Sequence, residues 1–128
     1  MKPILIIPGE LMDLNTYIDV ERGNKFGAAK IKKAETEMVH WYCIQQKPKP
    51  ILTPFDLEIH WYAKDKRKDS DNISFAQKFI LDGLVAAKVI PNDRFTTIKS
   101  IIHRFLVDSS YPRIEVGRSV LFDSEDSK

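Results

Sequence analysis

With 128 residues, the chain is long enough for one domain with a hydrophobic core and too short for two ordinary domains. Apolar residues make up 43% of it and charged residues 30%, a balance that excludes a wholly disordered chain. The net charge of +2 does not by itself indicate a polyanionic partner, and the single cysteine, Cys43, excludes an internal disulfide; it is expected to be a buried structural thiol in a reducing compartment.

The first half of the chain is predicted to hold one strand and two helical segments. Residues 4–7 are apolar and are followed by a Pro-Gly pair, which is typical of a short buried strand. Helical character begins near Asp13, loosens over residues 23–27 and resumes over residues 28–46, where two nearby prolines end it. The apolar opening is too short for a signal sequence or a membrane span, so we expect a cytoplasmic protein that does not enter a membrane.

The second half is predicted to alternate between strands and a helix. Residues 55–62 alternate strictly between apolar and polar side chains, which predicts a strand with one buried face. The charged stretch 64–71 is then a loop, and residues 73–87 have the pattern of a helix that the following proline ends. Two further strands are predicted over residues 96–107 and 113–122.

This order of elements predicts an α+β fold, in which a small, mostly antiparallel or mixed β-sheet is covered by helices. We expect a single domain over residues 1–122, followed by an acidic C-terminal tail over residues 123–128.

Three aspartates flank the predicted helix of the second half. Asp69 and Asp71 are two residues apart before it, so in extended chain they point the same way, and Asp93 follows the turn after it. Gathered carboxylates repel one another unless a cation lies between them, and carboxylates with open coordination positions suit Mg²⁺. Lys78 falls on the same predicted helical face as Asp71 and Asp82. We therefore predict that Asp69, Asp71 and Asp93 bind a metal that activates water, with Lys78 adding positive charge for phosphodiester hydrolysis.

The same residues also allow a purely structural interpretation. Aspartate and asparagine are common at helix N-termini, a capping pair of Ser74 and Gln77 is possible, and Asn92-Asp93 after a proline is a common turn. Asp82 is expected either to form an ion pair with Lys78 or to hydrogen-bond residues of the metal site without binding the metal itself. The three histidines have no metal-ligand spacing and are expected to have surface or hydrogen-bonded structural roles.

Three segments in a fixed order carry a likeness to a known family: Lys68–Asn72, Lys78–Leu84 and Val89–Arg94. Together they resemble the signature of the RusA-type Holliday junction resolvases of phages and prophages, and the likeness extends to residues 9–15 and 21–25. The resemblance implies a Mg²⁺-dependent endodeoxyribonuclease, for which Mn²⁺ can substitute, acting as a homodimer on four-way DNA junctions in recombination and repair.

The resemblance also implies roles for individual residues. The family's essential aspartates match Asp69, Asp71 and Asp93, and its essential lysine matches Lys78. The chain departs from the family at Asn92, where other members have an aspartate, and in a longer spacing between Asp71 and Lys78, which weakens the match of the lysine. The alternatives are a metal nuclease for other branched DNA and a non-catalytic DNA-binding protein.

Basic residues cluster in two places that fit a nucleic-acid partner without requiring it. Phosphate contacts position a protein on DNA and carry no base sequence, and a solvated surface is the alternative interpretation. We predict that Phe26 belongs to the core, with an exposed wedge at a junction centre as the alternative. The predicted DNA-binding residues are Arg22, Lys25, Lys30, Lys33, Lys66, Arg67 and Lys68.

Overall fold

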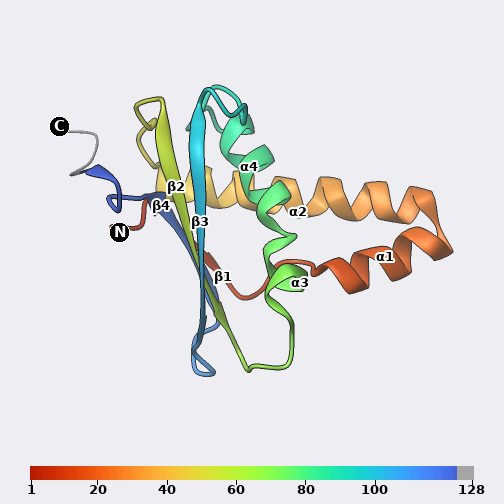
Figure 1. Ribbon diagram of the computed structural model, residues 1–128. Helices are drawn as coiled ribbons and strands as arrows, with labels where there is room; N and C mark the ends of the chain where they lie inside the picture. The colour runs from red at the N-terminus through yellow and green to blue at the C-terminus, as the bar shows by residue number, and fades with distance from the viewer. Residues whose placement is uncertain (124–128) are drawn as a thin grey trace.

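The computed structural model describes residues 1–123, which form two layers, with a mixed four-stranded sheet on one side and helices on the other (Figure 1). This confirms the predicted α+β fold. The acidic residues 124–128, predicted as a tail, lie outside the described residues. The elements in chain order are β1 (Leu5–Pro8), α1 (Leu14–Gly23), α2 (Lys25–Gln46), β2 (Phe55–Ala63), α3 (Ser70–Ser74), α4 (Gln77–Ala86), β3 (Ile98–Val107) and β4 (Arg113–Arg118).

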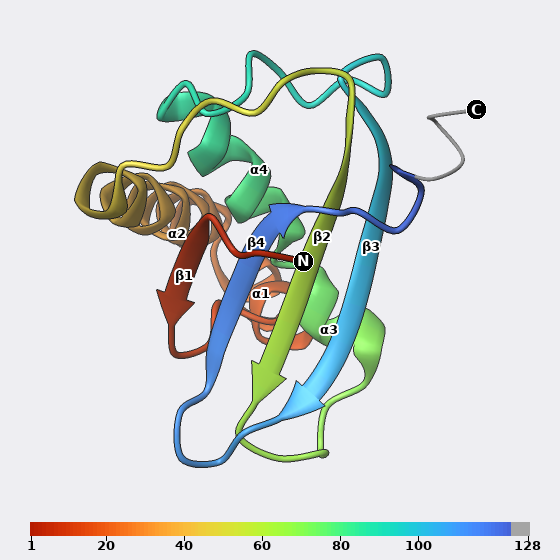
Figure 2. The same ribbon diagram turned by 90° about the vertical axis from the view of Figure 1, so that its left-hand side faces the viewer.

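The sheet has the strand order β1-β4-β2-β3, and the helices lie behind it when its open face is viewed (Figure 2). β2 pairs with β3 in parallel, whereas β4 pairs antiparallel with both β1 and β2. The parallel pair requires a crossover, which α3 and α4 supply between the two strands. At the β1 edge the side-chain amide of Gln46 continues the pairing, since it accepts from the Ile6 N–H at 2.8 Å and donates to the Ile6 carbonyl at 2.6 Å.

The core lies between the sheet and helices α2 and α4. Side chains on the helix-facing side of β2, among them Leu57 and Ile59, pack with Val39 of α2 and with Phe79 and Leu84 of α4. Each of these is at most 1% exposed, and full burial of such a side chain is worth about 1.5–3 kcal/mol. Cys43 belongs to this core, and burial raises the pKa of its thiol to about 11, which confirms the predicted buried cysteine.

β2 is buried more completely than the alternating pattern predicts. The prediction of one buried face is wrong for the first half of the strand, because Asp56 and Glu58 on the open face are only 5% and 9% exposed. The segment after β4 crosses this face, where Ser119 donates its backbone N–H to the Asp56 carbonyl and its hydroxyl to Glu58. Burial raises the pKa of the Glu58 carboxyl, but hydrogen bonds from Ser119 and His60 outweigh it and leave that pKa below its usual value.

The predicted helix over residues 73–87 is wrong as one element, since it is two helices. α3 ends at Ser74 and α4 begins at Gln77, with a tightened turn between them in which the Ala76 N–H bonds to the Ile73 carbonyl and the Phe79 N–H to the Ala76 carbonyl. Such bonds to the third preceding residue wind the chain more tightly than an α-helix and shift the register of the faces that follow. Side chains on either side of the turn therefore do not continue one α-helical face.

The other boundaries lie close to the predicted ones. The predicted loosening over residues 23–27 is a single residue, Asn24, which caps α2 by accepting from the Phe26 N–H at 3.0 Å. α2 ends at Gln46, followed by Lys47 at φ 52°. β4 is shorter than predicted. Asp123, predicted as the first residue of the acidic tail, accepts two 2.8 Å hydrogen bonds from Arg118.

Candidate functional site

Three of the predicted site residues line one solvent-open hollow beside α3, α4 and β3. Asp71 comes from the first turn of α3, Lys78 from the first turn of α4, and Asp93 from the turn that follows α4. Apolar side chains that include Phe75 and Leu81, and the polar side chains of Ser74 and Gln77, complete the lining. The structure thus brings together two carboxylates and one ammonium group that are up to 22 residues apart in sequence, counted from Asp71 to Asp93.

Lys78 provides the positive charge in this hollow and pairs with two aspartates. Its Nζ lies 3.2 Å from Oδ1 of Asp82 and 3.8 Å from Oδ2 of Asp93. The pair with Asp82 is the ion pair expected as one of the two roles of that residue. Because the Lys78 side chain is 50% exposed, the pairs add little to stability, and their main effect is to hold a positive charge at the hollow.

Asp69 does not share this hollow. Within residues 1–123, no three histidine, cysteine, aspartate or glutamate side chains form a group that could hold a metal ion. The physical reason lies at the start of α3. Asp69 is still extended, at φ −72° and ψ 153°, but the helix begins at Ser70, so successive side chains turn by about 100° and Asp71 does not follow the direction expected for extended chain. Metal binding by all three aspartates stays a prediction.

The purely structural interpretation predicted side-chain caps on the helices and a turn at Asn92-Asp93. The turn is present, but the side-chain caps of α3 and α4 are not. Asp69 occupies the N-cap position of α3 without a side-chain capping bond. Ala76 is the N-cap of α4 and has no side chain that could form one, so Ser74 and Gln77 form no capping pair. The Oδ1 atom of Asn92 accepts from the Arg94 N–H at 3.0 Å and from the Thr97 hydroxyl at 2.6 Å. Asn92 therefore shapes the turn that presents Asp93.

Asn72 has a role that the sequence did not suggest. It is 8% exposed, and its Oδ1 accepts from the Asn15 N–H at 2.9 Å. This bond ties α3 to the first turn of α1, beside Leu14, which also lines the hollow. An asparagine directly after an aspartate in a polar segment gives no signal of burial, so only the fold identifies this contact.

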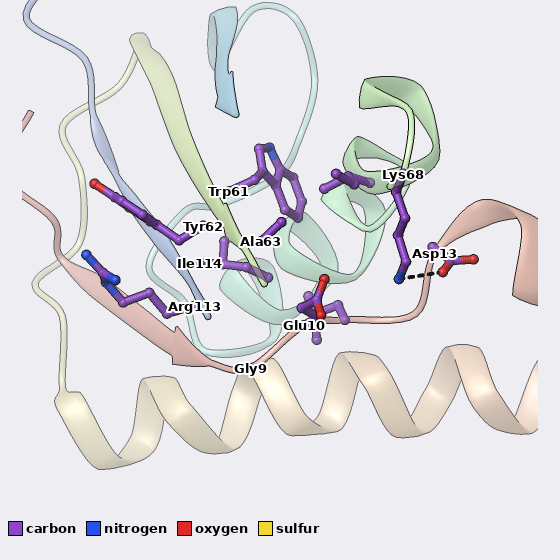
Figure 3. Close-up of a pocket in the computed structure, with 11 residues that line it drawn as sticks. Gly9, Glu10, Asp13, Trp61, Tyr62, Ala63, Lys68, Arg113 and Ile114 are labelled. Carbon is purple, nitrogen blue, oxygen red and sulfur yellow. Dashed lines mark ion pairs between the residues drawn. The ribbon is translucent and has the colours of Figure 1, made fainter. Parts of the chain in front are cut away.

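A second hollow lies at the base of α1 and is closed by an ion pair. Lys68 Nζ lies 2.7 Å from Oδ2 of Asp13, and Figure 3 shows the lysine reaching across from the segment before α3, with Glu10 nearby. The hollow's volume of about 20 Å³ has room for roughly one water molecule. The contact fastens α1 to the loop that carries Asp69.

Asp13 also caps α1, so its replacement separates two effects. Burial raises the pKa of the Asp13 carboxyl, but hydrogen bonds from Lys68 and Thr16 outweigh it and leave that pKa below its usual value. Asp13→Ala loses both the cap and the ion pair, and it is expected to lower the unfolding free energy at pH 7 by about 2 kcal/mol. Asp13→Asn keeps the cap and should cost less.

The contribution of the Asp13–Lys68 ion pair depends on pH. Because folding lowers the pKa of Asp13, the pair stabilises the protein above the unfolded-state pKa of about 3.9, and this effect is lost as the pH falls through the folded-state pKa. Urea unfolding at pH 7 and pH 3 measures this; an unchanged gap between wild type and Asp13→Asn at pH 3 would contradict it.

The predicted DNA-binding residues fall into two groups. Arg22, Lys25, Lys30 and Lys33 are exposed on the α1–α2 hairpin. The second group, on the loop after β2, is partly engaged: Lys68 is paired with Asp13, and Arg67 Nε lies 3.6 Å from Asp65, while Lys66 is exposed. DNA binding by both groups stays a prediction.

Two of the three histidines, His60 and His103, have the hydrogen-bonded roles that were expected. His60 bonds to Glu58, and His103 lies between Trp61 Nε1 and Gln77 Oε1, each at 3.0 Å. Burial lowers the pKa of His103, which favours its neutral, hydrogen-bonded form.

Comparison with known proteins leaves the family open. No family model, curated protein or solved structure matches the chain. The resemblance to RusA-type resolvases therefore stays a prediction based on the residues themselves. Among residues 1–123, no helix has the length and apolar character needed to cross a lipid bilayer.

Proposed function

We propose that this chain is a metal-dependent endodeoxyribonuclease of branched DNA, of the RusA type, that resolves four-way junctions. The observation that carries the proposal is the surface hollow that Asp71, Lys78 and Asp93 line together, with Lys78 paired to Asp93. Its opening to solvent suits a substrate as large as DNA, and its all-oxygen donor set with one fixed cation suits phosphodiester chemistry.

The carboxylates present fit a magnesium ion. Mg²⁺ is commonly held by one or two carboxylates and completes its shell with waters and substrate phosphate oxygens, so Asp71 and Asp93 meet its minimum requirement. When bound, the ion would supply an activated water and charge stabilisation at phosphorus. Mn²⁺ has the same ligand preference and is expected to substitute.

The protein's own residues supply positioning and fixed charge. Lys78, held between Asp82 and Asp93, places its ammonium group where a phosphate would gain negative charge during hydrolysis. Asp82 acts by orienting that lysine. Asp69, exposed and without a capping bond, is proposed as a third carboxylate that acts when DNA is bound. Paired cuts on two strands need two such hollows, which a homodimer would supply.

A second candidate function has its own supporting observation. Lys78 already neutralises part of the acidic charge at the hollow, and residues 1–123 hold no three-carboxylate group. A non-catalytic DNA-binding protein would have this arrangement without needing a metal.

One cleavage assay separates these functions. The full chain is incubated with a mobile four-way junction, a flap and a plain duplex, each with Mg²⁺, Mn²⁺ or EDTA. We expect symmetrical paired nicks in the four-way junction with either metal and none in EDTA. Preferential cutting of the flap would replace the resolvase with another branched-DNA nuclease. Binding without cutting under every condition would establish the non-catalytic alternative, and equal cutting in EDTA would overturn the metal mechanism.

A further inference from the structure

The α1–α2 hairpin is a projection that the core does not require. It extends away from the two-layer body (Figure 1). Within the described residues, α1 has no buried side chain. In α2 the buried residues are Ala28, Val39 and Cys43, of which the last two pack with the sheet and α4. Residues 14–33 are called the basic arm below.

Phe26 at the tip of the basic arm is 89% exposed, so the prediction that it belongs to the core is wrong. An exposed phenylalanine gains almost nothing from folding, because its ring stays in water. The backbone beneath it is nevertheless ordered, since Asn24 caps α2 by accepting from the Phe26 N–H itself. The structure therefore presents a ring to solvent from a fixed position.

The surface around this ring is strongly basic. Lys30 and Lys33 line the same shallow surface hollow as Phe26, and no acidic residue occurs between Glu21 and Glu35 in the sequence. A second copy of this surface would meet it with like charge, which disfavours self-association through the arm. An aromatic ring among lysines is instead the arrangement that binds nucleic acid, because bases stack on the ring and phosphates pair with the cations.

The base of the basic arm is fastened beside the candidate site. The Asn15 N–H bonds to Asn72, the rings of Tyr17 and Phe75 lie 5.2 Å apart, and Leu14 lines the hollow with Asp71. α1 has 10 residues, so the tip lies about 15 Å along the helix from this base. A nucleic acid in the hollow is therefore within a few nucleotides of Phe26.

We propose that the basic arm is a DNA-binding element in which Phe26 stacks on an unpaired base of branched or single-stranded DNA. The inference rests on the proposed function for its choice of DNA, and it adds a base contact that the metal site does not provide. Lys25, Lys30 and Lys33 hold the flanking phosphates.

The test uses a bulged duplex and a four-way junction carrying 2-aminopurine at successive positions near the unpaired bases or branch. Binding of the full chain is measured in EDTA, so that no strand is cut. Phe26→Ala and Phe26→Leu are expected to weaken binding about tenfold and to abolish the fluorescence change at one position, whereas Phe26→Trp keeps both. Unfolding temperatures should be unchanged, because the side chain is 89% exposed.

Leu52→Ala is the matched control, because Leu52 is 88% exposed but lies outside the arm, and it should leave DNA binding unchanged. Wild-type affinity and fluorescence for Phe26→Ala would overturn the inference. So would an effect of Phe26→Ala confined to self-association or to binding of anionic vesicles.

The two proposals fail separately in these experiments. Metal-dependent cleavage together with wild-type affinity and fluorescence for Phe26→Ala leaves the nuclease intact and removes the arm contact. A Phe26-dependent base signal without metal-dependent cutting leaves the arm contact and removes the nuclease.

Discussion

Asp71→Asn is expected to keep the fold and DNA binding while lowering the rate of junction cleavage by at least about 10²- to 10³-fold. Asp71 is exposed in the hollow, and within residues 1–123 its carboxylate has no hydrogen-bond or ion-pair partner, so the nearly isosteric amide should change the unfolding free energy by less than about 0.5 kcal/mol. The amide removes the negative charge that a divalent ion requires. Single-turnover cleavage at saturating protein, together with a binding measurement in EDTA, separates the two effects.

Two further variants and one control complete this prediction. Asp93→Asn should reproduce the loss, because Asp93 shares the hollow with Asp71. Glu10→Gln, at an exposed acidic residue before α1 that lies outside both the hollow and the basic arm, should cut like wild type. Undiminished cleavage by Asp71→Asn in Mg²⁺ would remove the mechanism.

Asp69→Asn decides how many carboxylates take part. Loss of cleavage would show that Asp69 joins the other two when DNA is bound, although it does not line their hollow in this structure. Wild-type cleavage would restrict the site to Asp71 and Asp93. Either result tests the one part of the sequence-based site that the fold does not bring together.

The fold could be predicted because its signals are local. The strict alternation in β2 and the prolines that follow α2 fix elements without knowledge of their neighbours. What sequence could not give is the effect of neighbours. Glu58 occupies a position that alternation assigns to solvent, and it is buried only because the distant Ser119 crosses over it.

The candidate site was predictable in part for the same reason. The predicted turn exists and brings Asp93 to 3.8 Å from Lys78, whereas the single helix that was predicted to align Asp71 with Lys78 is two helices. The direction of Asp69 relative to Asp71 depends on the residue at which α3 begins. The break between α3 and α4 depends on a tightened turn at Phe75 and Ala76, and both of these residues are compatible with a helix. Phe26 fits a helical pattern, but the pattern does not show whether its end of the helix packs against the rest of the protein, and the side chain is in fact exposed.

Gly83 lies where α4 crosses α2, and the resemblance to the resolvase signature does not reveal why a glycine stands there. A Cβ added at Gly83 would lie 2.4 Å from Cγ1 and 2.6 Å from Cβ of Val39, and 3.2 Å from the backbone N of His40. Val39 is fully buried and its own Cβ is fixed to the backbone, so the two helices would have to move apart.

Gly83→Ala is therefore expected to destabilise the protein, although alanine is the better helix former by about 1 kcal/mol. Overpacking at a rigid contact costs about 1–3 kcal/mol, and with both helices displaced we expect a net loss of about 2 kcal/mol, or about 8 °C in unfolding temperature. Gly23→Ala is the matched control: no atom lies within 4 Å of its added Cβ, so it should be neutral or slightly stabilising.

A double variant tests the contact with Val39. Adding Val39→Ala to Gly83→Ala removes the 2.4 Å contact with Cγ1 and keeps the 2.6 Å contact with Cβ. The double variant should therefore lose less unfolding free energy than the sum of the two single losses, while remaining less stable than wild type. Strict additivity of the two losses in urea unfolding would show that the helices do not meet through this pair of residues.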